Sequence, residues 1–119
     1  MKRTYIKKFI LIQGLLAAHL LSAQIKHDSI SNLISADEEF QIKFYDALKQ
    51  KGIENFNKAI KKLNDCKGLF PNRAVIYYEL GNIYFKIKRY SDSERNLKKA
   101  ISLDNKNFWY KDKLYNLYL

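Results

Sequence analysis

The sequence predicts an all-α protein in which antiparallel helix pairs are stacked side by side. Apolar residues after about residue 36 recur at spacings of three and four, which places them on single faces of successive helices. Glycine and proline are rare, with four and one in 119 residues, so few positions interrupt a helix. The apolar pattern also repeats with a period of about 34 residues, and a fixed period of that length is typical of stacked helix pairs.

The clearest unit runs over residues 74–107. Its two halves each place apolar or small residues on one helical face, namely Tyr77, Leu80, Gly81 and Tyr84, then Leu97, Ala100, Ile101 and Leu103. The pattern recurs one period later at Leu114, Asn116 and Tyr118, and one period earlier at Phe56, Ala59, Leu63, Cys66 and Leu69. These coincidences in one register predict a repeat array.

The unit resembles the tetratricopeptide repeat (TPR) family. The residues that carry the resemblance are Tyr77, Leu80, Gly81, Tyr84, Ser93, Leu97 and Ala100, with Ser93 small where alanine is usual. Asn105 stands where the family has its closing proline, whereas Pro71 keeps that proline in the preceding unit. The resemblance implies a short right-handed superhelix over residues 36–119, with repeats at about 37–73 and 74–107 and a half repeat at 108–119.

The first 23 residues predict a secretory signal peptide that is cleaved after Ala23. Four basic residues precede an apolar stretch from Phe9 to Leu21, and Ser22-Ala23-Gln24 follows. The apolar part has about 13 residues, whereas a membrane span needs about 20, so we expect no stable span after cleavage. An amphipathic helix of a cytoplasmic protein is the alternative, but no polar face supports it. The ending resembles signal peptides of bacterial envelope proteins, which favours the periplasm or cell envelope.

The first repeat is less regular than the second. Residues 24–35 are expected to be a flexible lead or a short helix, and Ser35 with Glu38 fits a capping box that would begin a helix near Ala36. The repeat register puts Asp46 in the place of Leu80. We interpret this as one extra residue in the helix, a shift that would restore Ala47 and Leu48 at the signature positions.

The remaining elements follow from local signals. Gly52 is expected to end the first helix, and a second helix is predicted over 54–67 with Pro71 after it. Ser91 and Glu94 fit a capping box at the start of the second helix of the next repeat. A last helix is predicted over 108–119. Its apolar residues are Trp109, Leu114 and Tyr118.

The residues predict neither an enzyme nor a cofactor or metal site. The chain has two histidines, and His27 has no cysteine or aspartate at metal-ligand spacing. Phosphate-binding, zinc-protease and serine-hydrolase motifs are absent. Cys66 occupies the position of Ala100 and is interpreted as a small buried packing residue, with a reactive thiol as the alternative.

The formal net charge of +10 raises the question of polyanion binding. The lysines are scattered along the helices and interleaved with acidic residues, which is typical of solvated faces and not of a stripe that follows phosphates. Nucleic-acid binding is therefore not favoured. A basic protein that binds polyanions at a surface is kept as an alternative.

The TPR resemblance implies a protein or peptide partner held in a concave groove. First-helix positions two, five, nine and twelve would line it, namely Val75, Tyr78, Asn82 and Phe85, then Trp109, Asp112, Asn116 and Leu119. The amides of Asn82 and Asn116 could bond the backbone of an extended peptide. The alternative for Tyr78 and Phe85 is packing between helices. Lysine and arginine are absent from these positions, so the carboxylate clamp of some TPR domains is not implied.

The sequence thus predicts an exported TPR interaction module, or scaffold, of the bacterial cell envelope. A half repeat leaves an apolar face open, because repeat arrays need at least three units and a polar cap. We therefore expect either self-association through residues 108–119, or that the chain is the N-terminal part of a larger TPR-containing envelope assembly or sensor protein.

Overall fold

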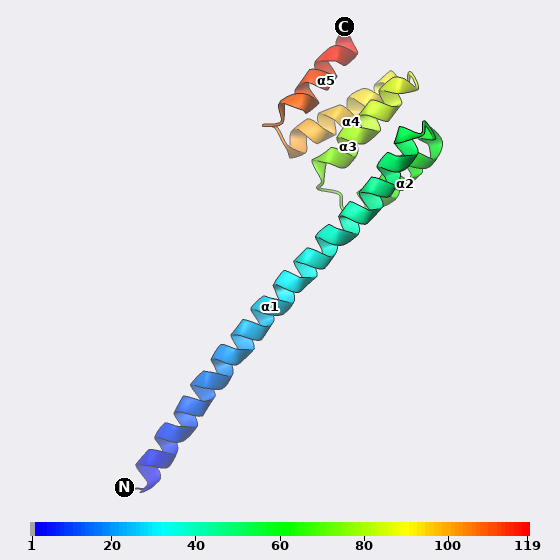
Figure 1. Ribbon diagram of the computed structural model, residues 1–119. Coiled ribbons are helices and arrows are strands. Elements are labelled where there is room, and N and C mark those ends of the chain that lie inside the picture. Colours follow the sequence, from blue (N-terminus) through cyan, green and yellow to red (C-terminus); the bar gives the residue numbers. More distant parts are fainter. Residues whose placement is uncertain (1) are drawn as a thin grey trace. The chain divides into compact units, whose positions relative to one another are not determined.

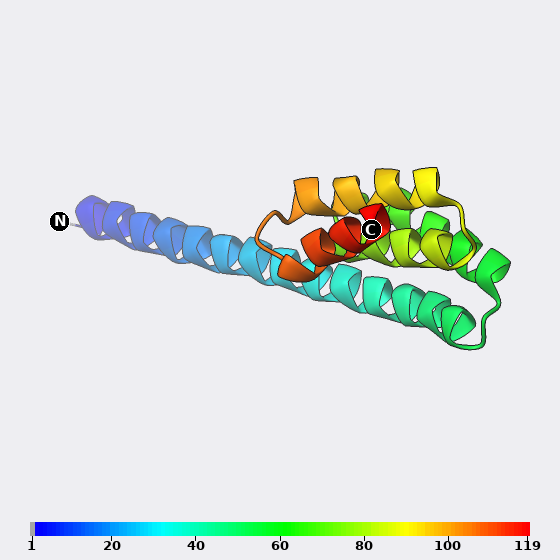
Figure 2. The same cartoon turned by 90° about the horizontal axis from the view of Figure 1, so that it is seen from above.

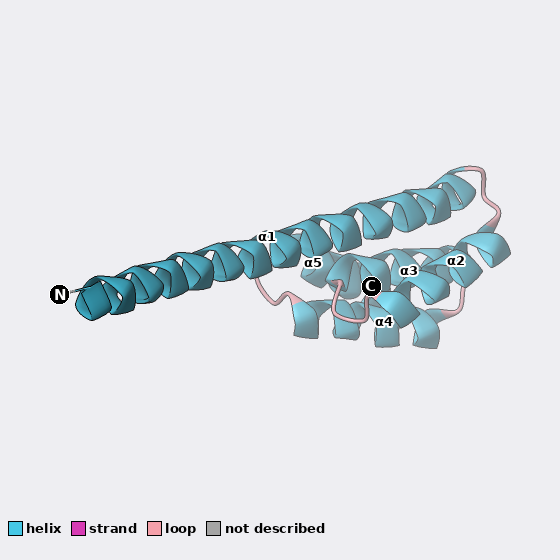
Figure 3. Ribbon diagram, turned by 90° about the horizontal axis from the view of Figure 1, so that it is seen from below, coloured by secondary structure: helices cyan, strands magenta, loops and turns pink. Residues whose placement is uncertain are grey.

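The computed structural model describes residues 2–119 and confirms the all-α fold. It contains α1 (Lys2–Gly52), α2 (Phe56–Leu69), α3 (Ala74–Lys86), α4 (Tyr90–Leu103) and α5 (Phe108–Tyr118) (Figure 1). The described residues contain no strand (Figure 3). They divide into two compact units, one up to Glu38 and one from Glu39 to Leu119. Each unit is described by itself below.

The first unit is helical throughout its described residues. The stretch Lys2–Gln24 is long and apolar enough to cross a membrane, although a signal sequence meets the same two criteria of length and composition. It is longer than the apolar core that the sequence indicated between Phe9 and Leu21. The side chains of Phe9 and His27 lie outside those that the structure describes.

No helix begins at Ala36, and residues 24–35 are helical and not a flexible lead. The predicted capping box at Ser35 and Glu38 is therefore wrong, because both residues lie inside α1. Serine and aspartate cost less than about 1 kcal/mol each in a helix interior. Since neither glycine nor proline occurs between Gly14 and Gly52, no residue here is strong enough to stop the helix.

The second unit consists of two helix pairs and one further helix. Residues 39–52 of α1 pair with α2, α3 pairs with α4, and α5 packs against α3 and α4 (Figure 2). The main core joins the first three helices, with Phe40, Phe44, Ala47, Ala59, Leu63, Cys66, Ile76, Leu80 and Ile83. Each fully buried leucine or isoleucine contributes about 1.5–3 kcal/mol. A second cluster joins α3, α4 and α5 through Tyr77, Ala100 and Tyr110.

The turns inside the two helix pairs are equivalent and lie one repeat period apart. Glu54 and Lys88 both adopt the left-handed conformation, with φ of 58° and 62°. The Glu54 amide bonds the Lys51 carbonyl and the Lys88 amide bonds the Phe85 carbonyl, both at 3.0 Å. A helix that ends in the same turn must keep the same register, so the first repeat contains no extra residue.

The predicted one-residue shift is therefore wrong, and Asp46 is the true equivalent of Leu80. Leu80 is 1% exposed because it packs against the helix pair that precedes α3. Within the second unit α1 has no helix pair before it, so Asp46 is exposed and pairs with Lys62 of α2. Ala47 is fully buried because it is the equivalent of Gly81, which packs on a second helix.

The ends of the other helices differ from the capping predictions in one place. Arg89 and not Ser91 precedes α4, and no side chain caps that end. The Asp92 carboxylate lies in the first turn and accepts from Arg89 Nε at 2.7 Å, which favours this helix end electrostatically. The start of α5 is capped by Asn107, whose side chain accepts from the Trp109 amide at 3.1 Å.

Candidate binding surface

The first helix of the central pair, α3, has three faces, and each of them has different surroundings. On α3, Ile76, Leu80 and Ile83 point into the preceding pair. Tyr77 and Gly81 face α4. The remaining direction carries Val75 and Asn82, both half-buried.

The signature residues of the central repeat hold α3 against α4. The Ser93 hydroxyl is buried and donates to the Gly81 carbonyl at 2.8 Å. A β-carbon on Gly81 would lie only 2.8 Å from Leu97 Cγ, so glycine permits this close approach. The Tyr77 hydroxyl donates to the carbonyl of Pro71 at 2.8 Å, which ties α3 to the turn before it.

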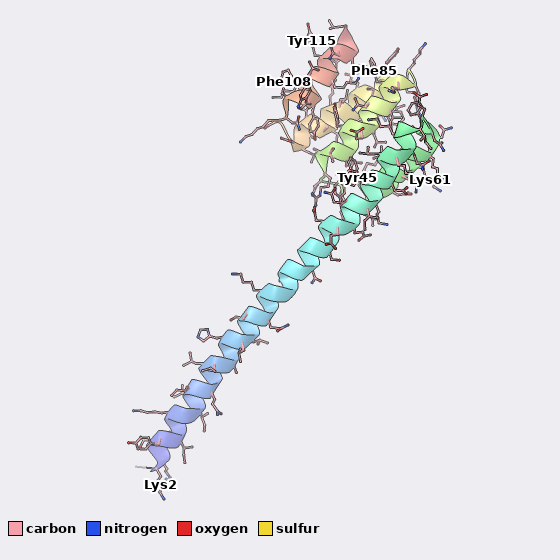
Figure 4. All side chains as sticks on the ribbon, in the orientation of Figure 1. Lys2, Tyr45, Lys61, Phe85, Phe108 and Tyr115 are labelled. Carbon is pink, nitrogen blue, oxygen red and sulfur yellow. The ribbon has the colours of Figure 1, made fainter. Side chains whose placement is uncertain are left out.

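Tyr78 and Phe85 lie half-buried between helices. The Tyr78 ring centroid lies 4.9 Å from that of Tyr110 on α5. The Phe85 ring lies 5.9 Å from Tyr90, and the Lys113 ammonium lies 4.2 Å from the Phe85 centroid. Both rings thus make the interhelical contacts that were the alternative to a groove role, although part of each remains accessible. Phe85 is labelled near the end of α3 in Figure 4.

Trp109 and Asn116 are the more open of the predicted positions, whereas Asn82 is half-buried. Trp109 is 68% exposed, and Asn116 is also exposed. The Asn116 amide nitrogen donates to the Asp112 carboxylate at 3.1 Å. An amide has two N–H donors and a carbonyl acceptor, so this bond uses only part of what Asn116 can offer.

Two further residues belong to this surface and were missed from the sequence. Gln41 and Leu48 lie one repeat period before Val75 and Asn82, and both are half-buried. The strict register would have found them, but the assumed extra residue hid them. We call the six equivalent positions the groove face: Gln41, Leu48, Val75, Asn82, Trp109 and Asn116.

A hollow of about 290 Å³ lies beside the groove face where α1 ends. It is lined by Leu48, Lys51, Gly52, Glu54, Glu79 and Lys86. The Lys51 ammonium and the Glu79 carboxylate form an ion pair on its wall. The hollow therefore offers one apolar side chain surrounded by charged groups that can form hydrogen bonds.

Several basic residues of the second unit lie over aromatic rings. The cation-to-centroid distances are 4.6 Å for Arg73 over Phe40, 5.8 Å for Lys86 over Phe56, and 4.8 Å for Arg89 over Tyr84. Lys113 over Phe85 is the fourth such contact. Such contacts occur roughly once per 70–80 residues, so this unit is rich in them. Part of its positive charge is thus used in packing.

Cys66 lies in the core, and the structure gives it no reactive environment. Its side chain is fully buried, and burial raises the pKa of the thiol above its ordinary value of 9.0. A raised pKa keeps the thiol protonated, and the thiolate is the reactive form. No group of three or more His, Cys, Asp or Glu residues suited to a metal occurs among the described residues.

Residues 74–107, which form α3, α4 and the turns around them, match the family model described as Tetratricopeptide repeat. This match confirms the resemblance for the central repeat. Repeats of this kind generally mediate binding between proteins and are not enzymatic. No curated protein matches the chain.

Proposed function

We propose that this chain is an exported interaction module of the bacterial cell envelope that binds an extended segment of a partner protein along the groove face. The observation that carries the proposal is the hollow beside Leu48, because it adjoins the face through which the TPR resemblance implies binding. A hollow of about 290 Å³ is large enough to accept a side chain of a bound segment.

The chemistry of the groove face suits a peptide backbone. Asn82 and Asn116 are equivalent amides on neighbouring first helices, and each can donate and accept. Trp109 adds an exposed indole, a group enriched at binding surfaces because one end is apolar and the other is polar. Leu48 adds apolar contact at the other end of the face.

Export is supported by the composition of the first unit. Basic residues, then apolar residues, then small residues stand in the order of a signal peptide, and Lys2–Gln24 meets the length and hydropathy that such a segment requires. Expression of the full chain in a Gram-negative host, followed by mass measurement of the periplasmic fraction, tests this. We expect a product that begins at Gln24, and a product that retains Met1 would refute cleavage.

Binding is tested by selecting peptides from a random display library on the full chain. The dissociation constants of the enriched peptides are then measured against groove-face variants. Asn82→Ala and Trp109→Ala should each weaken binding about tenfold, which corresponds to about 1.4 kcal/mol. Lys61→Ala is the matched control, because Lys61 is exposed on α2 (Figure 4), whereas the groove-face positions belong to α1, α3 and α5.

Two outcomes would refute the groove proposal. One is the absence of any enriched peptide after repeated selection. The other is an enriched peptide whose affinity falls for Lys61→Ala as much as for Asn82→Ala. Self-association through residues 108–119 stays a separate prediction, and light scattering of the full chain measures it.

A further inference from the structure

The contact between neighbouring first helices changes its charge from one repeat to the next. Between α1 and α3, the Lys51 ammonium pairs with the Glu79 carboxylate. One repeat period later the same two positions are Phe85 and Lys113. They are again in contact, because the Lys113 ammonium lies 4.2 Å from the centroid of the Phe85 ring. A neutral pair of opposite charges between α1 and α3 is thus replaced by a cation on an aromatic ring between α3 and α5.

The charge of Lys113 is therefore not balanced by a carboxylate. None of the ion pairs found among residues 2–119 involves Lys113. A ring face attracts a cation through its quadrupole and carries no formal charge, whereas an ammonium has three N–H donors. Lys113 is half-buried, so its neighbours position it before any ligand binds.

Lys113 stands on the groove face. It lies four residues after Trp109 and three before Asn116, and residues at these spacings lie on one side of a helix. Its contact with Phe85 places the ammonium on the side of α5 that faces α3. Lys113 is not one of the first-helix positions that the TPR resemblance assigns to the groove, which is why the sequence analysis found no cation there.

The single acidic residue of α5 points in another direction. Asp112 is the repeat equivalent of Tyr78, whose ring contacts the following first helix and not the preceding one. The Asp112 carboxylate accepts from the Asn116 amide and forms no ion pair among the described residues. Lys86 at the end of α3 lies over Phe56 of α2, on the side away from α5. Lys113 is thus the formal charge that α5 directs towards α3.

We propose that Lys113 binds an acidic side chain of the partner segment, so that the groove face selects segments with an aspartate or glutamate opposite α5. This inference rests on the proposed function and names the chemistry of the partner at one position. The Lys113 ammonium forms a charge-assisted hydrogen bond with the carboxylate, while the amides of Asn82 and Asn116 bond the neighbouring backbone. The formal net charge of +10 attracts acidic segments to the whole chain, but Lys113 fixes where the carboxylate lies.

Selection from a random peptide display library on three forms of the full chain tests the inference. The forms are the unaltered chain, Lys113→Glu and, as the matched control, Lys111→Glu. Lys111 is exposed and lies two residues from Lys113, so the two side chains do not share a helix face, although both variants change the net charge equally. The unaltered chain and Lys111→Glu should enrich peptides with aspartate or glutamate at one fixed position. Lys113→Glu should enrich lysine or arginine there.

The affinity of one enriched peptide is then measured in a double-mutant cycle. The acidic residue of the peptide is replaced by its amide, and Lys113 is replaced by methionine, which keeps an unbranched side chain on the Phe85 ring. Each change should weaken binding about tenfold, because each removes one hydrogen bond between charged groups. Both changes together should weaken binding little more than either alone, because they remove the same interaction. Thermal unfolding checks that Lys113→Met remains folded.

Three results would overturn the inference and leave the groove proposal standing. The first is a set of peptides that lose affinity for Asn82→Ala but share no acidic position. The second is the same enriched sequences for Lys113→Glu as for Lys111→Glu, which would mean that net charge alone attracts the peptides. The third is an additive double-mutant cycle, because the carboxylate would then bind elsewhere. The absence of any enriched peptide, in contrast, refutes groove binding itself, so the two failures are distinguishable.

Discussion

Replacing Gly81 with alanine should destabilise the protein, although alanine is the better helix former. Gly81 lies inside α3, where the exchange alone would gain about 1 kcal/mol. The new β-carbon would lie 2.8 Å from Cγ and 2.9 Å from Cδ2 of Leu97. Carbon atoms in contact prefer about 3.5–4.0 Å, and Leu97 is fully buried and cannot move into solvent.

Overpacking of this kind costs about 1–3 kcal/mol. Set against the helix-propensity gain, the net loss for Gly81→Ala is about 1 kcal/mol. For a unit of this size that loss lowers Tm by about 4–8 °C. Leu97→Ala alone should cost about 2–5 kcal/mol, because it leaves a cavity. In that background Gly81→Ala should stabilise the chain, because the clash is gone and the added methyl group partly fills the cavity.

The assay is thermal and urea unfolding of the four chains, followed by far-ultraviolet circular dichroism. The effect of Gly81→Ala on the free energy of unfolding should differ in sign between the original chain and the Leu97→Ala chain. The difference between these two effects is the coupling energy between residues 81 and 97. Gly68→Ala is the matched control, since a β-carbon there meets nothing within 4 Å and should be neutral or stabilising. If Gly81→Ala raises Tm as Gly68→Ala does, or if its sign is the same in both backgrounds, the close packing of α3 on α4 is refuted.

Four further predictions concern single groups and the surface charge. Burial raises the pKa of Tyr110 above 10, so the stability that this residue contributes is complete below pH 10 and is lost as the pH rises through the pKa of the folded state. The free energy of unfolding, measured by urea titration, should therefore fall less at alkaline pH in Tyr110→Phe than in the unaltered chain. The Cys66 thiol should react with a disulfide reagent at least about 100-fold more slowly in the folded chain than in urea, and equal rates would contradict its burial. Asn107→Ala should cost about 1 kcal/mol by removing the cap of α5, whereas Asn107→Gly should cost only a few tenths. The chain should leave a heparin column below about 0.2 M salt, because its cations are scattered and partly packed on rings; later elution would favour polyanion binding.

The central repeat could be predicted from the sequence because local and long-range signals agree there. Its apolar spacing, its small residues at 81, 93 and 100, and its period all indicate one helix pair. The first repeat was harder because Asp46 stands at a position that is apolar in the central repeat. A polar residue is tolerated at position 46 because the side chain is exposed. The exposure follows from the arrangement of the helix pairs, which the sequence does not show.

Two other differences have local causes. The start of α4 could not be found from its capping box, because the Arg89 and Asp92 pair occupies the first turn in place of a serine cap. The inward face of α5 was ambiguous because apolar residues lie all around that helix. The sequence analysis assigned Trp109 to the groove and did not single out Tyr110, which the structure buries and which the repeat register makes the equivalent of Ile76.

The two ends of the second unit carry different side chains, and this difference bears on whether copies of the protein can join head to tail. At one end the residues of α1 that would meet a preceding pair are Ile42, which is 72% exposed, and the charged Asp46 and Lys49. At the other end α5 presents Phe108 and Tyr115. Open-ended head-to-tail growth requires two complementary adhesive ends, and an end with two charged side chains beside one isoleucine is a poor complement to an aromatic end. The protein should therefore not polymerise head to tail into filaments.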